Sequence, residues 1–253
     1  MALIKDRSFA LKNRLLVISI TLNLACLAGL FSLVRIKGGF DYLWIKTSSM
    51  IRGQGFDRNY NPHYFNRKEH FARMPKQAED VLFIGDSMVE HCEWAKLLEN
   101  SDVLNRGILG DDTLGVLHRI EEMLKPIPPR KIYLMIGIND LFLGVSENHV
   151  LENFADILKR IEVHAPMCEV IVHGLLPIDP NRAPKPIPST TILSLNGRLS
   201  QLCREHDVVY LETFAAFADK KGRLANQYSR DGLHLNSKGY QNWKKLLEER
   251  GKE

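Results

Sequence analysis

Residues 81–87 read VLFIGDS, and residues 131–136 read KIYLMI. Each contains a short apolar run with β-branched residues, a pattern typical of a buried strand. Three further short apolar runs follow the same pattern, at 103–104, 169–172 and 208–211. We therefore expect five strands in this part of the chain.

Amphipathic segments separate the five runs and predict helices. These segments cover 89–100, 113–125, 148–163, 190–205 and 237–249. In one of them Val150, Phe154 and Ile157 recur at helical spacing. Short apolar strands that alternate with such helices predict an α/β fold: a five-stranded parallel sheet between two helical layers. In sheets of this kind ligands bind outside the carboxyl ends of the strands.

The composition is that of a globular protein. The chain has 253 residues, of which 45% are hydrophobic and 25% charged, which suits one domain with an appendage. The formal net charge is +4, but residues 1–37 alone carry +5, so residues 38–253 carry −1. Nucleic-acid binding depends largely on neutralising phosphates with cations. The charge pattern therefore excludes a nucleic-acid partner for the body of the chain.

Residues 15–34, LLVISITLNLACLAGLFSLV, contain no charged side chain. As a helix, twenty residues span about 30 Å, the thickness of the hydrocarbon core of a bilayer. A cleaved signal peptide is the alternative, but its apolar centre is usually about 7–15 residues long, and no clear A-x-A cleavage site follows. We expect an uncleaved transmembrane helix.

The charges on either side of this run predict its orientation. Four cations precede it and two follow it closely, which places the N-terminus in the cytoplasm and the body in the periplasmic or extracellular space. The chain then divides into a cytoplasmic tail at 1–14, a single-pass transmembrane helix at 15–34, a stalk at 35–75 and a domain at 76–253. One short helix is expected within the stalk, at 66–73. The oligomeric state cannot be predicted from these features.

The four cysteines, Cys26, Cys92, Cys168 and Cys203, show no CxxC spacing and no neighbouring histidine cluster. A zinc site is therefore not expected, and neither is any other metal or cofactor. Free thiols are the simpler interpretation, while one bridge among the last three stays open.

Polar residues that suit acyl transfer follow the predicted strands or precede the last helix. Taken singly, each is an ordinary turn or capping residue. Together they supply a nucleophile, Ser87, a base, His234, and a group to orient the base, Asp231. The N–H of Gly107 and the side chain of Asn139 could stabilise the oxyanion.

The order of these residues resembles that in the SGNH, or GDSL-type, esterases and lipases. The matching blocks are GDS at 85–87, Gly107, GxND at 137–140 and DxxH at 231–234, within about residues 78–245. The resemblance implies a flavodoxin-like three-layer sandwich, an acyl-enzyme on Ser87 and the Ser87 N–H as a further oxyanion donor. Met88 stands where the family name has leucine. GDSMVEHCEW and NRGILGDDT are most similar to the platelet-activating-factor acetylhydrolase catalytic-subunit branch.

The leading hypothesis is a membrane-anchored serine esterase that removes short acyl groups, such as acetyl, from a carbohydrate. The same residues would serve a lysophospholipase, a thioesterase or an acyltransferase. From another class, the chain could be a non-catalytic glycan-binding envelope protein on the same fold. The intact set of Ser87, Asn139, Asp231 and His234 argues against this last alternative.

The remaining chemistry-bearing residues have simpler interpretations. Asp86 and Asp140 are expected to fix loops rather than react. His118 lies within a predicted helix, and neither His91 nor His173 has an aspartate at the family's spacing. The proline-rich stretch 177–188 is expected to form a loop at the rim of the site.

Overall fold

The structure is a computed structural model that describes residues 2–36, 43, 47 and 62–250, without the side chains of 2–13, 15, 33 and 36. Most of the predicted stalk and the start of the predicted cytoplasmic tail therefore lie outside the description. The described residues include 76–250 of the predicted domain.

Five parallel strands form one sheet, as the sequence predicts. They are β1 Val81–Gly85, β2 Val103–Gly107, β3 Lys131–Met135, β4 Glu169–His173 and β5 Val209–Leu211. The strand order is β2-β1-β3-β4-β5, and every neighbouring pair is parallel. This is the flavodoxin-like order, in which the direction of winding reverses between β1 and β3. The crevice at the carboxyl ends of these two strands is where a ligand is expected.

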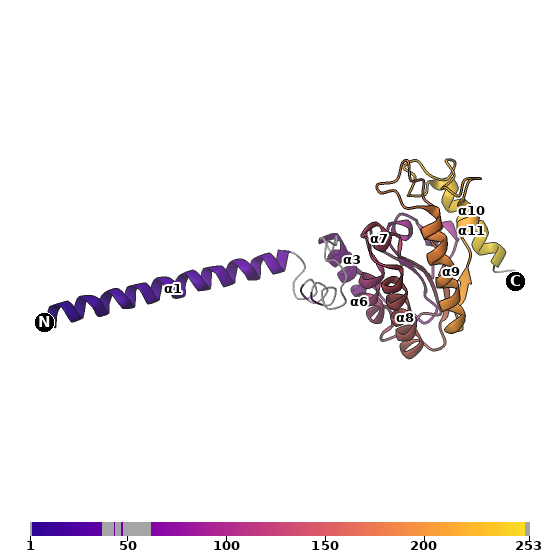
Figure 1. Ribbon diagram of the computed structural model, residues 1–253. Coiled ribbons are helices and arrows are strands. Elements are labelled where there is room, and N and C mark those ends of the chain that lie inside the picture. The colour runs from indigo at the N-terminus through magenta and orange to yellow at the C-terminus, as the bar shows by residue number, and fades with distance from the viewer. Residues whose placement is uncertain (1, 37–42, 44–46, 48–61, 251–253) are drawn as a thin grey trace.

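Helices cover both faces of the sheet (Figure 1). The long ones are α6 Thr113–Leu124, α8 Glu147–His164, α9 Ser189–Glu205 and α11 Ser237–Arg250. The short ones are α4 Ser87–Glu90, α5 Trp94–Leu97, α7 Ile138–Phe142 and α10 Phe214–Phe217. The sequence analysis did not predict α7 or α10, because one or two turns are too short to show helical periodicity.

Alternate residues of β1 enter two separate cores, which explains why the strand is apolar throughout. Leu82 and Ile84 join the core beneath α6, α8 and α9. Val81 and Phe83 join the core beneath α5 and α11. In the second core Phe83 stacks on Trp94 with ring centroids 4.1 Å apart. The three-layer arrangement is therefore confirmed.

The helix predicted over 89–100 is wrong, because the chain forms α4 and α5 with a break between them. The side chain of Asn105 holds this break. Its amide lies within hydrogen-bond distance of the carbonyls of Val89, Glu90 and Cys92, at 2.8, 3.1 and 2.8 Å. A partner on a neighbouring strand thus replaces the intrahelical bonds that a continuous helix would have made.

Helix α3, Pro62–Arg73, packs against the domain although the sequence analysis placed this region in the stalk. Tyr64 and Phe71 form a small core with Ile108. The Tyr64 hydroxyl donates to the carbonyl of Gly115 in α6 at 2.9 Å. The folded unit therefore begins at least one helix earlier than the predicted boundary at residue 76.

Helix α1, Ala2–Ile36, precedes the α/β domain (Figure 1). Across the residues with a description, no helix has the length and apolar character needed to cross a membrane. The structure therefore does not support the transmembrane helix predicted over 15–34.

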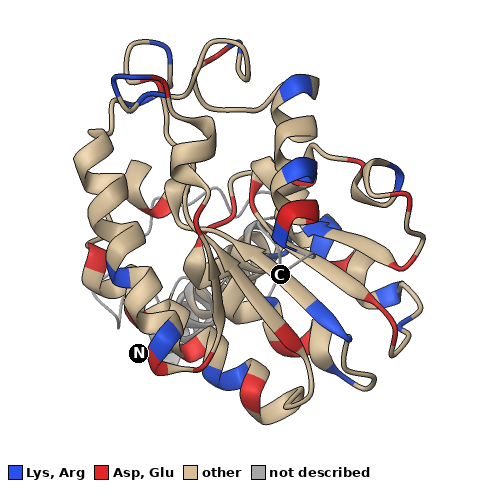
Figure 2. Cartoon of the chain, turned by 90° about the vertical axis from the view of Figure 1, so that its right-hand side faces the viewer, with Lys and Arg blue, Asp and Glu red and all other residues tan. Residues whose placement is uncertain are grey.

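Charged residues of both signs are interspersed over the domain in the view of Figure 2. This distribution agrees with the near-neutral charge of residues 38–253. The four cysteines are free thiols, so the structure contains none of the bridges that the sequence left open. Burial raises the pKa of the Cys92 and Cys203 thiols to about 12, which keeps both protonated at neutral pH.

Candidate active site

Ser87 is the first residue of α4, directly after β1, on the crevice between β1 and β3. Asp86 caps this helix, because its Oδ1 accepts the Met88 N–H at 2.9 Å. Gly85 permits the sharp strand-to-helix turn, since a Cβ there would lie 2.3 Å from the carbonyl oxygen of Met135. The local sequence thus directs the Ser87 side chain towards the strand ends.

Three side chains form a continuous hydrogen-bonded chain. Ser87 Oγ lies 3.1 Å from His234 Nε2, and His234 Nδ1 lies 2.7 Å from Asp231 Oδ2. This is the geometry in which a carboxylate orients an imidazole and the imidazole takes the proton of a hydroxyl. The structure therefore brings together the three residues to which the sequence assigned these roles.

The loop around Asp231 holds the carboxylate ionised. Its Oδ1 accepts the N–H groups of Leu233 and His234 at 3.0 and 2.8 Å. Burial raises the pKa of Asp231, but the His234 ring and these two N–H groups outweigh it and lower the pKa to about 2. A negative charge beside Nδ1 favours the imidazolium that forms when His234 takes a proton.

Arg182 connects the proline-rich loop to the Asp231 loop. Its guanidinium pairs with Asp179 at 2.8 Å and donates to the carbonyls of Ser229 and Arg230 at 3.3 and 3.2 Å. The Asp179 N–H also donates to the carbonyl of Gly232 at 2.8 Å. The expected rim loop at 177–188 is confirmed, and these bonds attach it to the segment that carries Asp231.

Asn139, in α7 after β3, reaches the same crevice. Its Nδ2 donates one hydrogen bond to the carbonyl of Asp111 at 2.8 Å. No described residue accepts the second N–H of this amide. Asn139 lines one pocket with Ser87 and His234, so this N–H is suited to a ligand oxygen beside Ser87.

The structure does not place the Gly107 N–H in this pocket. That N–H donates to Oδ1 of Asn105 at 2.8 Å, so it is already occupied. A Cβ on Gly107 would lie 2.3 Å from the backbone nitrogen of Glu90. Gly107 is therefore a packing glycine that lets β2 approach α4, which corrects the oxyanion role predicted for it.

Gly110, three residues further along the chain, lines the pocket instead. Its φ of +75° is a conformation that favours glycine, and no described residue accepts its N–H. The sequence analysis missed Gly110 because NRGILGDD offers two glycines and the nearer one to the strand was chosen. Its position before Asp111-Asp112, at the start of a helix, was the available signal.

The loop that carries Gly110 is supported from two sides. Glu90 accepts the N–H of Leu109 and pairs with His63 of α3 at 2.9 Å. Asp111 forms a fully buried ion pair with Arg119, with a closest distance of 2.8 Å. Arg119 also donates to the carbonyl of Gly85 at 3.3 Å, which links this loop to the turn before Ser87.

The pocket above Ser87 has a volume of about 320 Å³. Its remaining lining residues are mainly apolar: Leu109, Phe142, Leu143, Pro184, Lys185 and Leu233. Lys185, from the proline-rich loop, donates to the carbonyl of Phe142 at 2.7 Å and so closes one side.

The other residues named in the sequence analysis have structural positions. Asp140 accepts both the hydroxyl and the N–H of Thr113 at 2.6 and 3.0 Å, which fixes the start of α6 as expected. His173 is buried, and burial lowers its pKa to about 3, so its ring is neutral. Burial raises the pKa of Asp86 to about 7. His91 lies beside His234, with ring centroids 5.2 Å apart.

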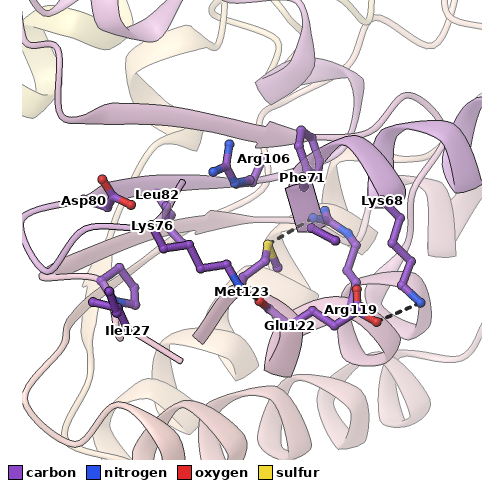
Figure 3. Close-up of a pocket in the computed structure, with 12 residues that line it drawn as sticks. Lys68, Phe71, Lys76, Asp80, Leu82, Arg106, Arg119, Glu122, Met123 and Ile127 are labelled. Atoms are coloured by element: carbon purple, nitrogen blue, oxygen red, sulfur yellow. Dashed lines mark hydrogen bonds and ion pairs between the residues drawn. The ribbon is translucent and has the colours of Figure 1, made fainter. Parts of the chain in front are cut away.

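An enclosed pocket of about 10 Å³ lies between α3 and α6, away from Ser87 (Figure 3). Four of its lining residues are cations, Lys68, Lys76, Arg106 and Arg119, and Lys68 pairs with Glu122 at 3.0 Å. This volume is that of about one water molecule. The pocket is therefore too small for a substrate.

Within the described part of the chain, no group of three His, Cys, Asp or Glu side chains is arranged to hold a metal ion. The site consists of a hydroxyl, an imidazole, a carboxylate and amide donors. These groups are sufficient for hydrolysis of an ester by nucleophilic catalysis.

The fold and this arrangement of side chains define a serine hydrolase of the SGNH class. The sequence model of the GDSL-like Lipase/Acylhydrolase family matches residues 83–241, so the chain belongs to that family. The protein is therefore a serine hydrolase that acts on ester bonds.

Two groups of relatives are informative. The chain is 33% identical over 198 residues to platelet-activating factor acetylhydrolase IB subunit alpha2 of Bos taurus and Homo sapiens, covering 74% of this chain and 80% of each relative. A solved GDSL-like lipase from Bacteroides thetaiotaomicron superposes with a TM-score of 0.65 at 20% identity, covering 74% of this chain and 96% of that one. The second comparison supports the fold.

Proposed function

We propose that the protein hydrolyses acetyl or similarly short acyl esters of a carbohydrate through an acyl-enzyme on Ser87. The hydrogen-bonded chain from Ser87 through His234 to Asp231, open to the pocket that Asn139 lines, carries this proposal. In the first step the Ser87 hydroxyl attacks the ester carbonyl while His234 takes its proton. His234 then gives that proton to the leaving oxygen, and water releases the acyl group by the reverse sequence.

Three donors are available to the oxyanion of the tetrahedral intermediate: the N–H of Ser87, the N–H of Gly110 and the side chain of Asn139. The N–H groups of Ser87 and Gly110 have no acceptor among the described residues, and one N–H of Asn139 is likewise unoccupied. The bond from Asn139 to the carbonyl of Asp111 holds the side chain beside the Gly110 loop. Donors fixed in advance stabilise charge that develops in the transition state.

A second, small and mainly apolar cavity is an argument for a short acyl group. It measures about 10 Å³, and its lining is apolar apart from Asp86, with Met88, Ile138, Leu175 and Leu233 among the apolar residues. Leu233 borders both this cavity and the pocket above Ser87. A space of this size has room for about one water-sized group, so it accepts a methyl group more readily than a long chain. The name of the relatives, acetylhydrolase, agrees with an acetyl ester.

Turnover of p-nitrophenyl esters from acetyl to palmitoyl tests the acyl preference. We expect kcat/KM of the full-length protein to be highest for acetyl and to fall as the chain lengthens. A steady preference for palmitoyl would favour the lysophospholipase or thioesterase alternative. No turnover of any ester by folded protein would favour the glycan-binding alternative.

The described helices give no support to a membrane span, but on the sequence we also propose that residues 15–34 anchor the chain in the cell membrane, with the N-terminus in the cytoplasm and the α/β domain on the other side. The support is the run of twenty uncharged residues together with its flanking charges. Nine large apolar side chains of α1, from Leu16 to Phe31, are at least half exposed. Thr21 and Asn23 donate to carbonyls four residues earlier, at 2.9 Å each, as polar groups in lipid must.

Membrane fractionation with an alkaline wash tests the anchor. The full chain is expected to stay with the membranes, and a variant with arginine at Leu22, Leu24 and Leu27 is expected to be released. Protease added to intact cells or spheroplasts should digest the α/β domain of the full chain. Release of the unaltered chain by the wash would overturn the proposal.

A further inference from the structure

A second and wider groove lies beside the pocket above Ser87, between the α4–α5 segment and the start of α11. Its volume is about 710 Å³. Most of the lining residues are polar, among them Glu93, Lys96, Glu99, Asn236, Ser237 and Gln241, while Leu97, Leu235 and Tyr240 add apolar surface. This volume falls in the range of about 300–1,000 Å³ that small-molecule sites occupy.

The groove adjoins the pocket above Ser87 at the imidazole of His234. His234 lines the pocket above Ser87, whereas the next residue, Leu235, and His91 line the groove. The rings of His91 and His234 are 5.2 Å apart and inclined at 53°. The two histidines therefore form the junction between the two spaces.

The proposed mechanism determines what should lie at this junction. His234 Nε2 must deliver its proton to the oxygen of the leaving alcohol, so that oxygen has to lie next to the imidazole. The oxyanion donors Gly110 and Asn139 belong to the other space, above Ser87. The part of the substrate beyond the leaving oxygen can therefore extend past His91 into the groove.

The side chains of the groove suit a polyhydroxyl group better than a hydrocarbon chain. Lys244, which is only partly exposed, pairs with the exposed Glu99 at 3.2 Å, and Lys96 and Glu93 form an exposed pair at 3.4 Å. A hydrocarbon chain would have to cover these charges without replacing their contacts with water, which is unfavourable. Hydroxyl groups could instead exchange hydrogen bonds with them, and Leu235 supplies an apolar surface for the C–H face of a sugar ring.

We infer that this groove is the subsite for the alcohol part of the substrate, that its occupant is an oligosaccharide, and that His91 positions the first sugar ring against His234. The inference rests on the proposed function and adds to it the place of the sugar and the residues that select it. Ser87, His234 and Asp231 keep the roles that the proposed function gives them.

Gln241→Trp in the full-length protein tests the subsite, because a large ring on the exposed start of α11 would fill the groove. The probes are an O-acetylated xylo-oligosaccharide, whose alcohol part needs the groove, and p-nitrophenyl acetate, whose leaving group is a single ring. We expect the ratio of kcat/KM for the sugar ester to that for p-nitrophenyl acetate to fall at least tenfold. Lys245→Trp, on the same helix but outside the groove, is the matched control and should leave this ratio unchanged.

His91→Leu tests the junction. We expect a rise of several-fold in KM for the sugar ester, with a smaller change in kcat, because a positioning contact to the substrate is lost. An equal loss for both esters in Gln241→Trp, or no change in the ratio, would overturn the inference. So would a wild-type protein that hydrolyses p-nitrophenyl acetate but not the sugar ester. If folded wild-type protein hydrolysed neither ester, the proposed function itself would fail.

Discussion

Two aspartates near the pocket, Asp231 and Asp111, each pair with a basic side chain, and the two pairs differ in exposure and in their surroundings. Asp231 pairs with His234, and their side chains are 52% and 30% exposed. Asp111 pairs with Arg119, and their side chains are 0% and 1% exposed. The first pair faces the ligand pocket, and the second lies in the protein interior beneath it.

The exposed pair takes part in the reaction, whereas the buried pair holds the loops of the site in position. The exposed pair can gain and lose a proton, because water and substrate reach it. The buried pair cannot exchange partners, and its Arg119 joins the Gly110 loop to the turn before Ser87. Breaking the first pair should therefore affect catalysis, and breaking the second should affect stability first.

The largest effect is expected from Ser87→Ala. Removal of the nucleophile should lower kcat for p-nitrophenyl acetate by about 10⁴-fold or more, as in other serine hydrolases. The melting temperature should change little, because the hydroxyl contributes only one hydrogen bond, to His234. Ser101→Ala, at an exposed turn, is the matched control. Activity of Ser87→Ala equal to that of the wild type would refute the assignment.

The next largest effect is expected from Arg119→Met, which breaks the buried pair and should lower stability. It leaves Asp111 buried without its cation, which typically costs about 3–5 kcal/mol in the free energy of unfolding. Urea denaturation measures this loss. Arg73→Met removes an exposed pair with Glu69 and should cost only about 0–1 kcal/mol. Equal effects of the two substitutions would mean that the buried pair has no special role.

Asn139→Ala should reduce turnover while the fold persists. Loss of one oxyanion donor typically lowers kcat by about 10²–10³-fold, or about 2.7–4 kcal/mol. The steady-state parameters should show the loss in kcat with KM nearly unchanged. Asn148→Ala, on the exposed start of α8, controls for the substitution itself. A loss that appeared only in KM would assign Asn139 to substrate binding rather than to the transition state.

The smallest effect concerns the pH dependence of stability at Asp231. Because its pKa of about 2 lies below the ordinary value of 3.8, the ionised carboxylate stabilises the folded state above about pH 4. That contribution is lost as the pH falls from about 4 to 2. Since the side chain is half exposed, we expect less than about 1 kcal/mol.

Melting temperatures of the wild type and Asp231→Asn at several pH values measure this contribution. The two proteins should differ at pH 5 and converge towards pH 2, and added salt should reduce the difference. A difference that grew on acidification would contradict the pKa assigned to Asp231.

The sequence predicted the sheet and four of the side chains at the site for identifiable reasons. Apolar runs such as 81–84 mark strands directly, and a parallel sheet brings their carboxyl ends to one edge. Ser87 and Asn139 follow such runs. Asp231 and His234 follow no strand, and the order of blocks shared with the family identified them.

The remaining features depend on side-chain contacts that the pattern of apolar residues does not reveal. The Gly107 N–H is occupied by Asn105, a neighbour in the chain whose side chain also holds the break between α4 and α5. Gly110 was therefore missed although it lies in the same motif. Helix α3 was assigned to the stalk, because its contact through Tyr64 joins residues 51 positions apart.

The central claim is that His234, held by Asp231, activates the Ser87 hydroxyl. Reaction of the full-length protein with a fluorophosphonate, followed by peptide mass spectrometry, tests it most directly. The adduct should form on Ser87 in the wild type and at least a hundredfold more slowly in His234→Ala, while Asp86→Asn remains reactive. An unreactive Ser87 in folded wild-type protein, or equal rates with and without His234, would contradict the account.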